Sequence, residues 1–253
     1  MDLGLEGKKA IVTGASRGIG FHAAAALAAE GCAVGICARG QEGVDVAVRR
    51  LEESGAKIFG RALDVADRSV LQTWVRDAAE ALGGLDIVVA SVSALGGGDG
   101  EEGWTQSFEV DIMHTVRTIE AALPFLKESD TASIVIVSSV AAREAGPFGG
   151  PYGTVKAGLV LYAKDQALHL APEGIRVNVV SPGTIYFEDG FWGRMERENP
   201  EFYEGALGSN PMGRMGSPEE VARAIAFLVS PASSFTTGAN LLVDGALTRG
   251  VQA

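Results

Sequence analysis

The chain has 253 residues, of which 47% are hydrophobic, and its 21 basic and 32 acidic side chains give a formal net charge of −11. This length allows one large domain or two small ones. The excess of negative charge argues against nucleic acid or an anionic membrane surface as the main partner. No apolar stretch is long and pure enough to span a bilayer, and the N-terminal residues lack the layout of a signal peptide.

The sequence has few cysteine and histidine residues that could form a metal site or a disulfide. Cys32 and Cys37 are the only cysteines, and their pattern is unlike that of metal ligands, so we expect a protein of the reducing cytoplasm. The histidines His22, His114 and His169 are scattered along the chain. We expect them to be surface residues of helices, and we predict no metal site.

Short apolar runs rich in valine and isoleucine alternate with longer amphipathic segments. The runs predict strands at 9–15, 32–39, 57–65, 85–91, 133–139, 175–183 and 240–246. The intervening segments predict helices at about 18–30, 41–54, 67–82, 103–128, 152–171 and 217–230. The strands are apolar throughout, as strands covered on both faces should be. We therefore expect an α/β fold with a doubly wound parallel sheet of about seven strands and helices on both faces. Ligands of such folds bind at the carboxyl ends of the strands.

The first predicted strand runs into the turn TGASRGIG, residues 13–20, which opens a helix. Gly14, Gly18 and Gly20 leave room for a phosphate to approach the backbone, and the helix N-terminus supplies free N–H groups and a positive dipole end. Ser16 and Arg17 lie in the turn and can add polar contacts. The spacing differs from the G-x-G-x-x-G of the usual dinucleotide fingerprint. The alternative is a tight strand–helix turn without a ligand.

The ends of the second and third strands suggest which nucleotide binds. An acidic residue after the second strand would hold the ribose 2′-hydroxyl of NAD, whereas an arginine suits the 2′-phosphate of NADP. Arg39 stands there, and Arg17 is expected beside it, so we predict NADP(H) over NAD(H); the alternative is a solvated surface arginine. Asp64 after the third strand either accepts from the adenine amino group or caps a turn, and Asp67 is the better helix cap.

The stretch GGPYGTVKAG, residues 149–158, places Tyr152 four residues before Lys156. One helical turn brings them together on one face. A tyrosine ordinarily stays protonated near neutral pH, because its usual pKa is about 10. A neighbouring ammonium favours the phenolate and so allows proton transfer. In isolation, the pair would be an ordinary exposed helix pair.

The segments TGASRGIG, LDV, IVSS, YGTVK and SPG occur in an order that resembles the short-chain dehydrogenase/reductase family, and the resemblance covers nearly the whole chain. It implies a single Rossmann-type domain over residues 1–253 that moves hydride between NAD(P) and a carbonyl or alcohol. It also implies that Tyr152 is the acid/base, that Ser139 orients the carbonyl, and that Lys156 binds the nicotinamide ribose. The further nucleotide contacts that it implies are Ile19, Val65, Ala90, Ser91, Pro182, Gly183, Thr184 and Ile185.

Two positions depart from the family pattern. The usual NNAG after the fourth strand is ASVS, residues 90–93, which keeps the backbone path but loses side-chain hydrogen bonds. Asp111 replaces the usual asparagine, whose backbone carbonyl, by the resemblance, holds a water that relays protons to the lysine. The carboxylate of Asp111 either disfavours the tyrosine phenolate or stabilises the ammonium of Lys156, and the sequence leaves both alternatives open.

The substrate side is less defined. The glycine-rich segment 93–103 predicts a surface loop, and the resemblance makes segment 186–215 a variable lid. Its aromatic residues either bind an apolar substrate or pack the lid: Tyr186, Phe187, Phe191, Trp192, Phe202 and Tyr203. Arg194 and Arg197 either meet an anionic substrate or form a solvated face.

The overall pattern is nearest to 3-oxoacyl-carrier-protein reductases, but no basic patch for an acidic carrier is evident, and sugars, steroids and xenobiotic ketones remain open as substrates. The helix from 152 is apolar nearly all round, which predicts a homotetramer or homodimer. The alternative hypothesis is that the protein binds NADP(H) but is catalytically weak or silent and acts as a regulatory protein.

Overall fold

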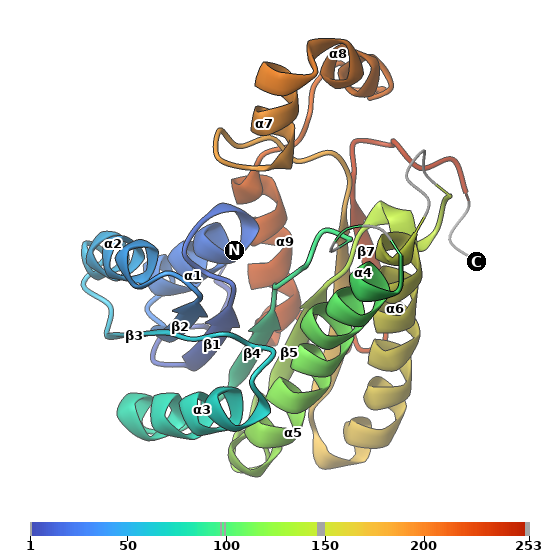
Figure 1. Ribbon diagram of the computed structural model, residues 1–253. Coiled ribbons are helices and arrows are strands. Elements are labelled where there is room, and N and C mark those ends of the chain that lie inside the picture. The colour runs from blue at the N-terminus through green and yellow to red at the C-terminus, as the bar shows by residue number, and fades with distance from the viewer. Residues whose placement is uncertain (1, 97, 99, 146–149, 251–253) are drawn as a thin grey trace.

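The computed structural model describes residues 2–96, 98, 100–145 and 150–250. Within these residues, seven parallel strands form one sheet in the order β3-β2-β1-β4-β5-β6-β7 (Figure 1). The strands are β1 Lys9–Thr13, β2 Ala33–Ala38, β3 Ile58–Ala62, β4 Ile87–Ala90, β5 Ser133–Val137, β6 Arg176–Pro182 and β7 Asn240–Val243. The predicted sheet is therefore confirmed, and its order changes direction beside β1, where α/β sheets bind ligands.

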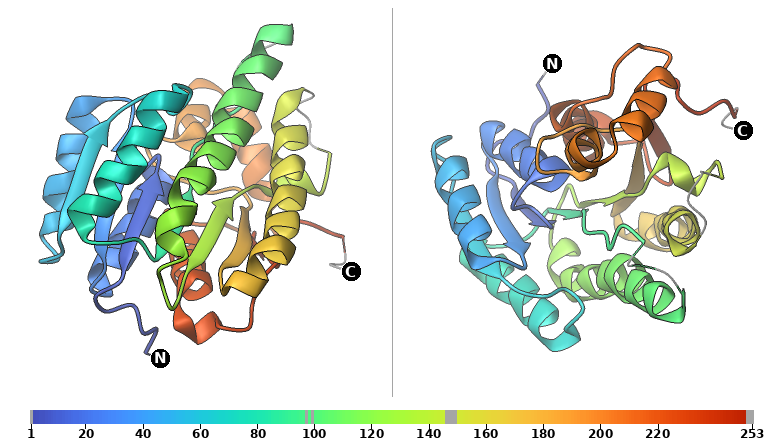
Figure 2. Two further views of the ribbon diagram at one scale, coloured as in Figure 1. Left: turned by 90° about the horizontal axis from the view of Figure 1, so that it is seen from below. Right: turned by 45° about the horizontal axis from the view of Figure 1, so that its top comes forward.

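Helices cover both faces of the sheet (Figure 2). They are α1 Gly18–Ala29, α2 Gln41–Glu52, α3 Arg68–Leu82, α4 Gly100–Ser107, α5 His114–Leu126, α6 Pro151–Leu170, α7 Phe191–Glu198, α8 Pro200–Gly208 and α9 Pro218–Val229. One core cluster joins α1, α2 and α9 to the sheet, and a second joins α3, α5 and α6 to its other face. Among the described residues, no helix is long and apolar enough to cross a membrane.

Local capping explains where several helices begin and end. Asp67 caps α3 by accepting hydrogen bonds from the backbone N–H groups of Ser69 and Val70, and these bonds lower the pKa of its carboxyl. Gly31, just beyond α1, has a φ of +84°, a conformation that glycine adopts without strain. The side chain of Glu220 accepts from the backbone N–H of Ser217 at 2.9 Å, which starts α9. The cap at Asp67 is the one that the sequence analysis above predicts.

The predicted helix 103–128 is wrong in its details. It begins earlier, at Gly100, so the expected loop 93–103 is helical in its last part. Between α4 and α5 the backbone widens into a π-helical turn, η1, at Phe108–Met113. Such turns hold one extra residue and often occur at functional sites. Asp111 lies within this turn.

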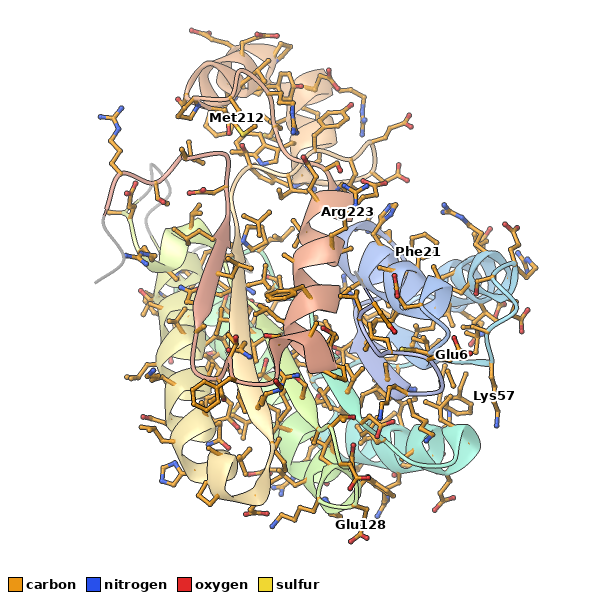
Figure 3. The ribbon with its side chains drawn as sticks, turned by 180° about the vertical axis from the view of Figure 1, so that it is seen from behind. Glu6, Phe21, Lys57, Glu128, Met212 and Arg223 are labelled. Carbon is orange, nitrogen blue, oxygen red and sulfur yellow. The ribbon has the colours of Figure 1, made fainter. Side chains whose placement is uncertain are left out.

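The strands all end at one edge of the sheet, and α7 and α8 stand beyond that edge (Figure 1). Met212, labelled at the top of Figure 3, lies at this end, whereas Glu128, labelled at the bottom, lies at the opposite end. The predicted nucleotide and substrate residues come after β1, β2, β3, β4, β5 and β6, so the fold brings them to the same edge.

Candidate active site

The turn after β1 is shaped by its glycines. Gly14 and Gly18 have φ values of +71° and +57°, and a Cβ on Gly20 would collide with the carbonyl oxygen of Gly14. Arg17 occupies the N-cap of α1 without a side-chain cap hydrogen bond, and a guanidinium has no acceptor to offer. The first N–H groups of α1, from Gly18 and Ile19 onward, are therefore suited to an anion.

Arg17 and Arg39, which the sequence analysis expects to lie side by side, have different contacts in the structure. The Nη1 atom of Arg17 donates to the carbonyl oxygen of Asp189 at 3.0 Å. Arg39 is exposed immediately after β2. Ser16 lies against α2, since a Cβ on Gly43 would stand 3.5 Å from the Cβ of Ser16. Arg39 thus lies exposed at the carboxyl end of β2, whereas Arg17 contacts the segment after β6.

Asp64 acts as a turn cap in this structure. Its Oδ1 atom accepts from the backbone N–H of Ala66 at 2.9 Å, and the residue is exposed. Val65 beside it is buried in the core.

The two adjacent serines after β5 have different partners. The hydroxyl of Ser138 donates to the carbonyl oxygen of Lys156 at 2.8 Å, which ties the end of β5 to α6. The Oγ atom of Ser139 accepts from the N–H of Ala141 at 3.2 Å at the start of the short helix η2, Val140–Ala142. Ser139 is the acceptor in that bond, so the bond does not consume its hydroxyl hydrogen. This difference agrees with the choice of Ser139 as the residue that orients a carbonyl.

Tyr152 and Lys156 lie one turn apart in α6, as predicted. The ammonium of Lys156 is 5.9 Å from the centre of the Tyr152 ring. Lys156 is only 2% exposed, and its Nζ atom donates to the carbonyl oxygen of Val137 at 3.3 Å. A side chain on Gly153 would meet the carbonyl oxygen of Ala141 at 2.8 Å, so glycine there lets η2 pack close to Tyr152.

Asp111 contacts Lys156 directly. Its Oδ1 atom lies 2.9 Å from the Nζ atom of Lys156, in an ion-pair contact rather than a well-directed hydrogen bond. Its Oδ2 atom accepts from the backbone N–H of Ala94 at 2.9 Å. The backbone carbonyl of Asp111, the expected water holder, accepts from the hydroxyl of Thr115 at 2.8 Å. The contact with the ammonium is formed in this structure, and it also places negative charge beside the group that is expected to favour the tyrosine phenolate.

His114 is a site residue that the sequence analysis placed wrongly, because it is fully buried rather than on the surface. Its Nε2 atom is 2.9 Å from Thr13 Oγ1, which in turn accepts from the N–H of Ser91 at 3.1 Å. Its Nδ1 atom is 3.4 Å from Thr115 Oγ1. Since Thr115 gives its proton to the carbonyl of Asp111, the consistent assignment is a neutral ring that carries its proton on Nδ1. Burial lowers the pKa of His114 to about 4, in agreement with this state.

This network explains how the ASVS segment keeps its place. The backbone N–H of Ser91 is bound by Thr13 at the end of β1, and that of Ala94 is bound by Asp111. Side chains from β1 and η1 thus hold the segment through its backbone. Ala90 is buried in β4 and Ser91 is half-buried just after it.

The segment after β6 is held by the neighbouring strand and loop. The N–H of Gly183 donates to Val243 at 3.0 Å, and a Cβ there would meet Asp244 at 2.9 Å. The hydroxyl of Thr184 donates to Asn210 at 2.7 Å. Ile185 forms an isolated parallel bridge with Gly216. Pro182 ends β6, so all four predicted residues lie at the carboxyl edge.

The aromatic residues of the 186–215 segment largely pack against one another. Trp192 stacks on Phe202 with 5.5 Å between ring centres. Tyr186 meets Tyr203 edge to face and donates its hydroxyl to Glu196 at 2.6 Å. Contact with this carboxylate raises the pKa of Tyr186. Within the described residues, no group of three or more histidine, cysteine or acidic side chains could hold a metal ion.

The sequence of the chain was compared with protein-family models and with known proteins. A family model described as enoyl-(acyl carrier protein) reductase matches residues 14–248. Isoepoxydon dehydrogenase of Penicillium expansum is 36% identical over 255 residues, which cover 98% of each chain. Dehydrogenase/reductase SDR family member 4 of Bos taurus is 35% identical over 95% of this chain and 87% of its own length.

The fold agrees with a solved structure of L-sorbose reductase from Gluconobacter frateurii, in complex with NADPH and L-sorbose. The TM-score is 0.89, with 28% identity over 99% of this chain and 100% of that chain. The sequence relatives, the family model and the site geometry agree, and the chain belongs to the short-chain dehydrogenase/reductase family of oxidoreductases.

Proposed function

We propose that this chain interconverts a carbonyl compound and a secondary alcohol with NADP(H), using Tyr152 as the acid/base. The observation that carries this proposal is the buried ammonium of Lys156, fixed 5.9 Å from the Tyr152 ring centre. A positive charge in a poorly solvated site stabilises a phenolate more strongly than in water. A phenol so placed can exchange a proton with a substrate oxygen.

The residues present fit a dinucleotide. The uncapped start of α1 offers N–H groups to phosphate oxygens, and the glycines of the turn let those oxygens approach the backbone. When bound, the nicotinamide supplies or accepts the hydride at the carbonyl carbon. Pro182, Gly183, Thr184 and Ile185 would line it at the end of β6.

The side chains divide the remaining chemistry between them. In reduction, Tyr152 donates its proton to the carbonyl oxygen, and in oxidation its phenolate takes that proton back. Ser139 donates a hydrogen bond to the same oxygen and so orients it. Lys156 stabilises the phenolate and binds the nicotinamide ribose. Asp111 keeps the lysine in place through their ion pair.

Arg39 supports NADP over NAD, because a guanidinium at the end of β2 matches a 2′-phosphate. The NADPH complex of L-sorbose reductase is consistent with this preference. The names of that relative and of isoepoxydon dehydrogenase support a small-molecule carbonyl or alcohol as the substrate.

We also propose one nucleotide-binding domain over residues 1–253, with 186–215 as its lid, that associates into a homodimer or homotetramer in the cytoplasm. Leu161 and Leu168 of α6 are 65% and 67% exposed, which supports association through this helix. Cys32 and Cys37 are buried free thiols, and burial raises the pKa of each to about 12. Such inert thiols suit a reducing compartment.

The test follows NADPH absorbance with a panel of ketones and aldehydes, with NADH in parallel. Wild type is expected to oxidise NADPH, and Tyr152→Phe is expected to lose at least about a hundredfold in rate. Tyr162→Phe, on the same helix, is the matched control and should stay active. Tight NADPH binding without turnover of any carbonyl would instead favour the silent regulatory protein.

A further inference from the structure

A cavity of about 340 Å³ lies between the glycine turn and the 186–215 segment. Three arginines line it: Arg17 from the N-cap of α1, and Arg194 and Arg197 from α7. Asp189 is the one acidic residue among the described residues that line this cavity. In a chain with a net charge of −11, this cavity gathers positive charge, and guanidiniums around a hollow attract anions.

Two of these arginines donate hydrogen bonds to neutral backbone carbonyls, which are weak acceptors. Arg17 donates to the backbone carbonyl of Asp189 at 3.0 Å, and Arg197 donates to that of Glu188 at 3.1 Å. A neutral carbonyl uses one of the five N–H donors of a guanidinium. Phosphate oxygens make shorter and stronger hydrogen bonds with arginine and can bind two N–H groups at once. A phosphate therefore offers these guanidiniums a stronger acceptor than the two carbonyls do.

Nearby carboxylates neutralise the cluster only in part, since one acidic residue, Asp189, lines the cavity with three arginines. Glu198 is 3.9 Å from Arg194, and both side chains are more than half exposed, so their ion pair is weak. Glu196 accepts a hydrogen bond from Tyr186 at 2.6 Å and does not line the cavity.

The cavity adjoins the expected phosphate position. Arg17 directly precedes Gly18, the first residue of α1. The ring of Phe187 rests on the same glycine, since a Cβ on Gly18 would stand 2.7 Å from its Cζ atom. The segment that leads into α7 is therefore seated on the glycine turn, and α7 stands beyond the strand ends (Figure 1).

We propose that Arg194 and Arg197, together with Arg17, form a phosphate clamp for the bridging diphosphate of the dinucleotide. In this clamp, α7 contributes positive charge from the side opposite the N-terminus of α1. The proposal rests on the proposed function and deepens it, because it makes the 186–215 segment part of the nucleotide site and not only a cover for substrate.

The test measures nucleotide binding by titration calorimetry, without any turnover. The probes are ADP-ribose, which carries the bridging diphosphate, and adenosine 2′-monophosphate, which carries only the 2′-phosphate. The double variant Arg194→Gln/Arg197→Gln is expected to lose about tenfold or more in affinity for ADP-ribose. Affinity for NADPH should fall by a similar factor, and affinity for adenosine 2′-monophosphate should stay unchanged. Arg49→Gln/Arg50→Gln, which removes two exposed arginines at the end of α2, is the charge-matched control.

Equal affinity of wild type and the double variant for ADP-ribose would overturn the clamp and leave the proposed function standing. A loss confined to adenosine 2′-monophosphate and NADPH would overturn it too, because the arginines would then read the 2′-phosphate. Unchanged nucleotide affinity with a raised KM for carboxylate-bearing ketones would assign the arginines to substrate instead. A wild type that binds none of the nucleotides would overturn the proposed function itself.

Discussion

Asp111 and Lys156 form a buried ion pair, with 2.9 Å between Oδ1 and Nζ and side-chain exposures of 0% and 3%. Removing one partner of such a pair leaves a buried charge without compensation. We expect Asp111→Asn to lower the free energy of unfolding by roughly 3 kcal/mol, as measured by urea denaturation. Asp165→Asn, at an exposed position of α6, should change it by less than about 0.5 kcal/mol. Equal stability of the two variants would show that the pair contributes nothing.

Ser138 and Ser139 allow a comparison of adjacent residues. Ser139→Ala should lower kcat by about a hundredfold, because the substrate oxygen loses a hydrogen bond that strengthens in the transition state. Ser138→Ala should instead lose roughly 1 kcal/mol of stability, because the bond that ties β5 to Lys156 is removed. Steady-state kinetics and urea denaturation separate the two roles. The reverse pattern, with kcat sensitive to Ser138, would contradict the assignment.

His114 makes stability depend on pH. Burial lowers its pKa from 6.5 to about 4, and the neighbouring Asp111 opposes this shift in part. Below pH 6.5 the unfolded chain takes up a proton here, whereas the folded chain stays neutral until about pH 4. Stability should therefore fall across this window by up to ~3 kcal/mol from this group. Unfolding measured at pH 7, 6 and 5 should show a shallower slope in His114→Gln, while His169→Gln keeps the wild-type slope.

Arg39 should set the cofactor preference. Replacing it with aspartate removes the partner of the 2′-phosphate and offers an acceptor to a ribose hydroxyl. We expect the ratio of kcat/KM for NADPH over NADH to fall at least about tenfold in Arg39→Asp. Arg68→Asp, at the start of α3, serves as the control for the change in charge. An unaltered ratio would show that residues other than Arg39 set the cofactor preference.

The exposed leucines of α6 should mediate assembly. Light scattering coupled to size exclusion is expected to give a dimer or tetramer for wild type. Leu161→Glu/Leu168→Glu should shift the protein toward monomer, because two charges would be buried without partners. Val46→Glu, which is 41% exposed on α2, should leave the assembly intact. A wild-type monomer would end this part of the proposal.

The parts of the site that depend on local patterns could be predicted from the sequence. The glycines of the first turn, the Tyr152–Lys156 spacing and the cap at Asp67 each follow from neighbouring residues. Strand alternation likewise predicted the parallel sheet. These features depend on backbone geometry over a few residues, which sequence spacing reports directly.

Contacts between distant segments could not be predicted in this way. Arg17 and Asp189 are 172 positions apart, so no spacing rule joins them. No feature of the sequence distinguished His114 from a surface residue of a helix. Its buried position depends on its contact with Thr13 at the end of β1. The π-helical turn was also missed, since the periodicity of a helix does not reveal one inserted residue.

The π-helical turn at Phe108–Met113 makes this site depend on chain length as well as on chemistry. A turn of this kind holds one residue more than the α-helix it interrupts. Loss of the codon for Ile112 or Met113, which lie between Asp111 and His114, would allow a regular helix. Each residue of such a helix rotates the next by about 100°, so one of these two side chains would leave its buried partners. Gain or loss of one residue here would therefore act on the site as strongly as a substitution, although every chemical group would still be present.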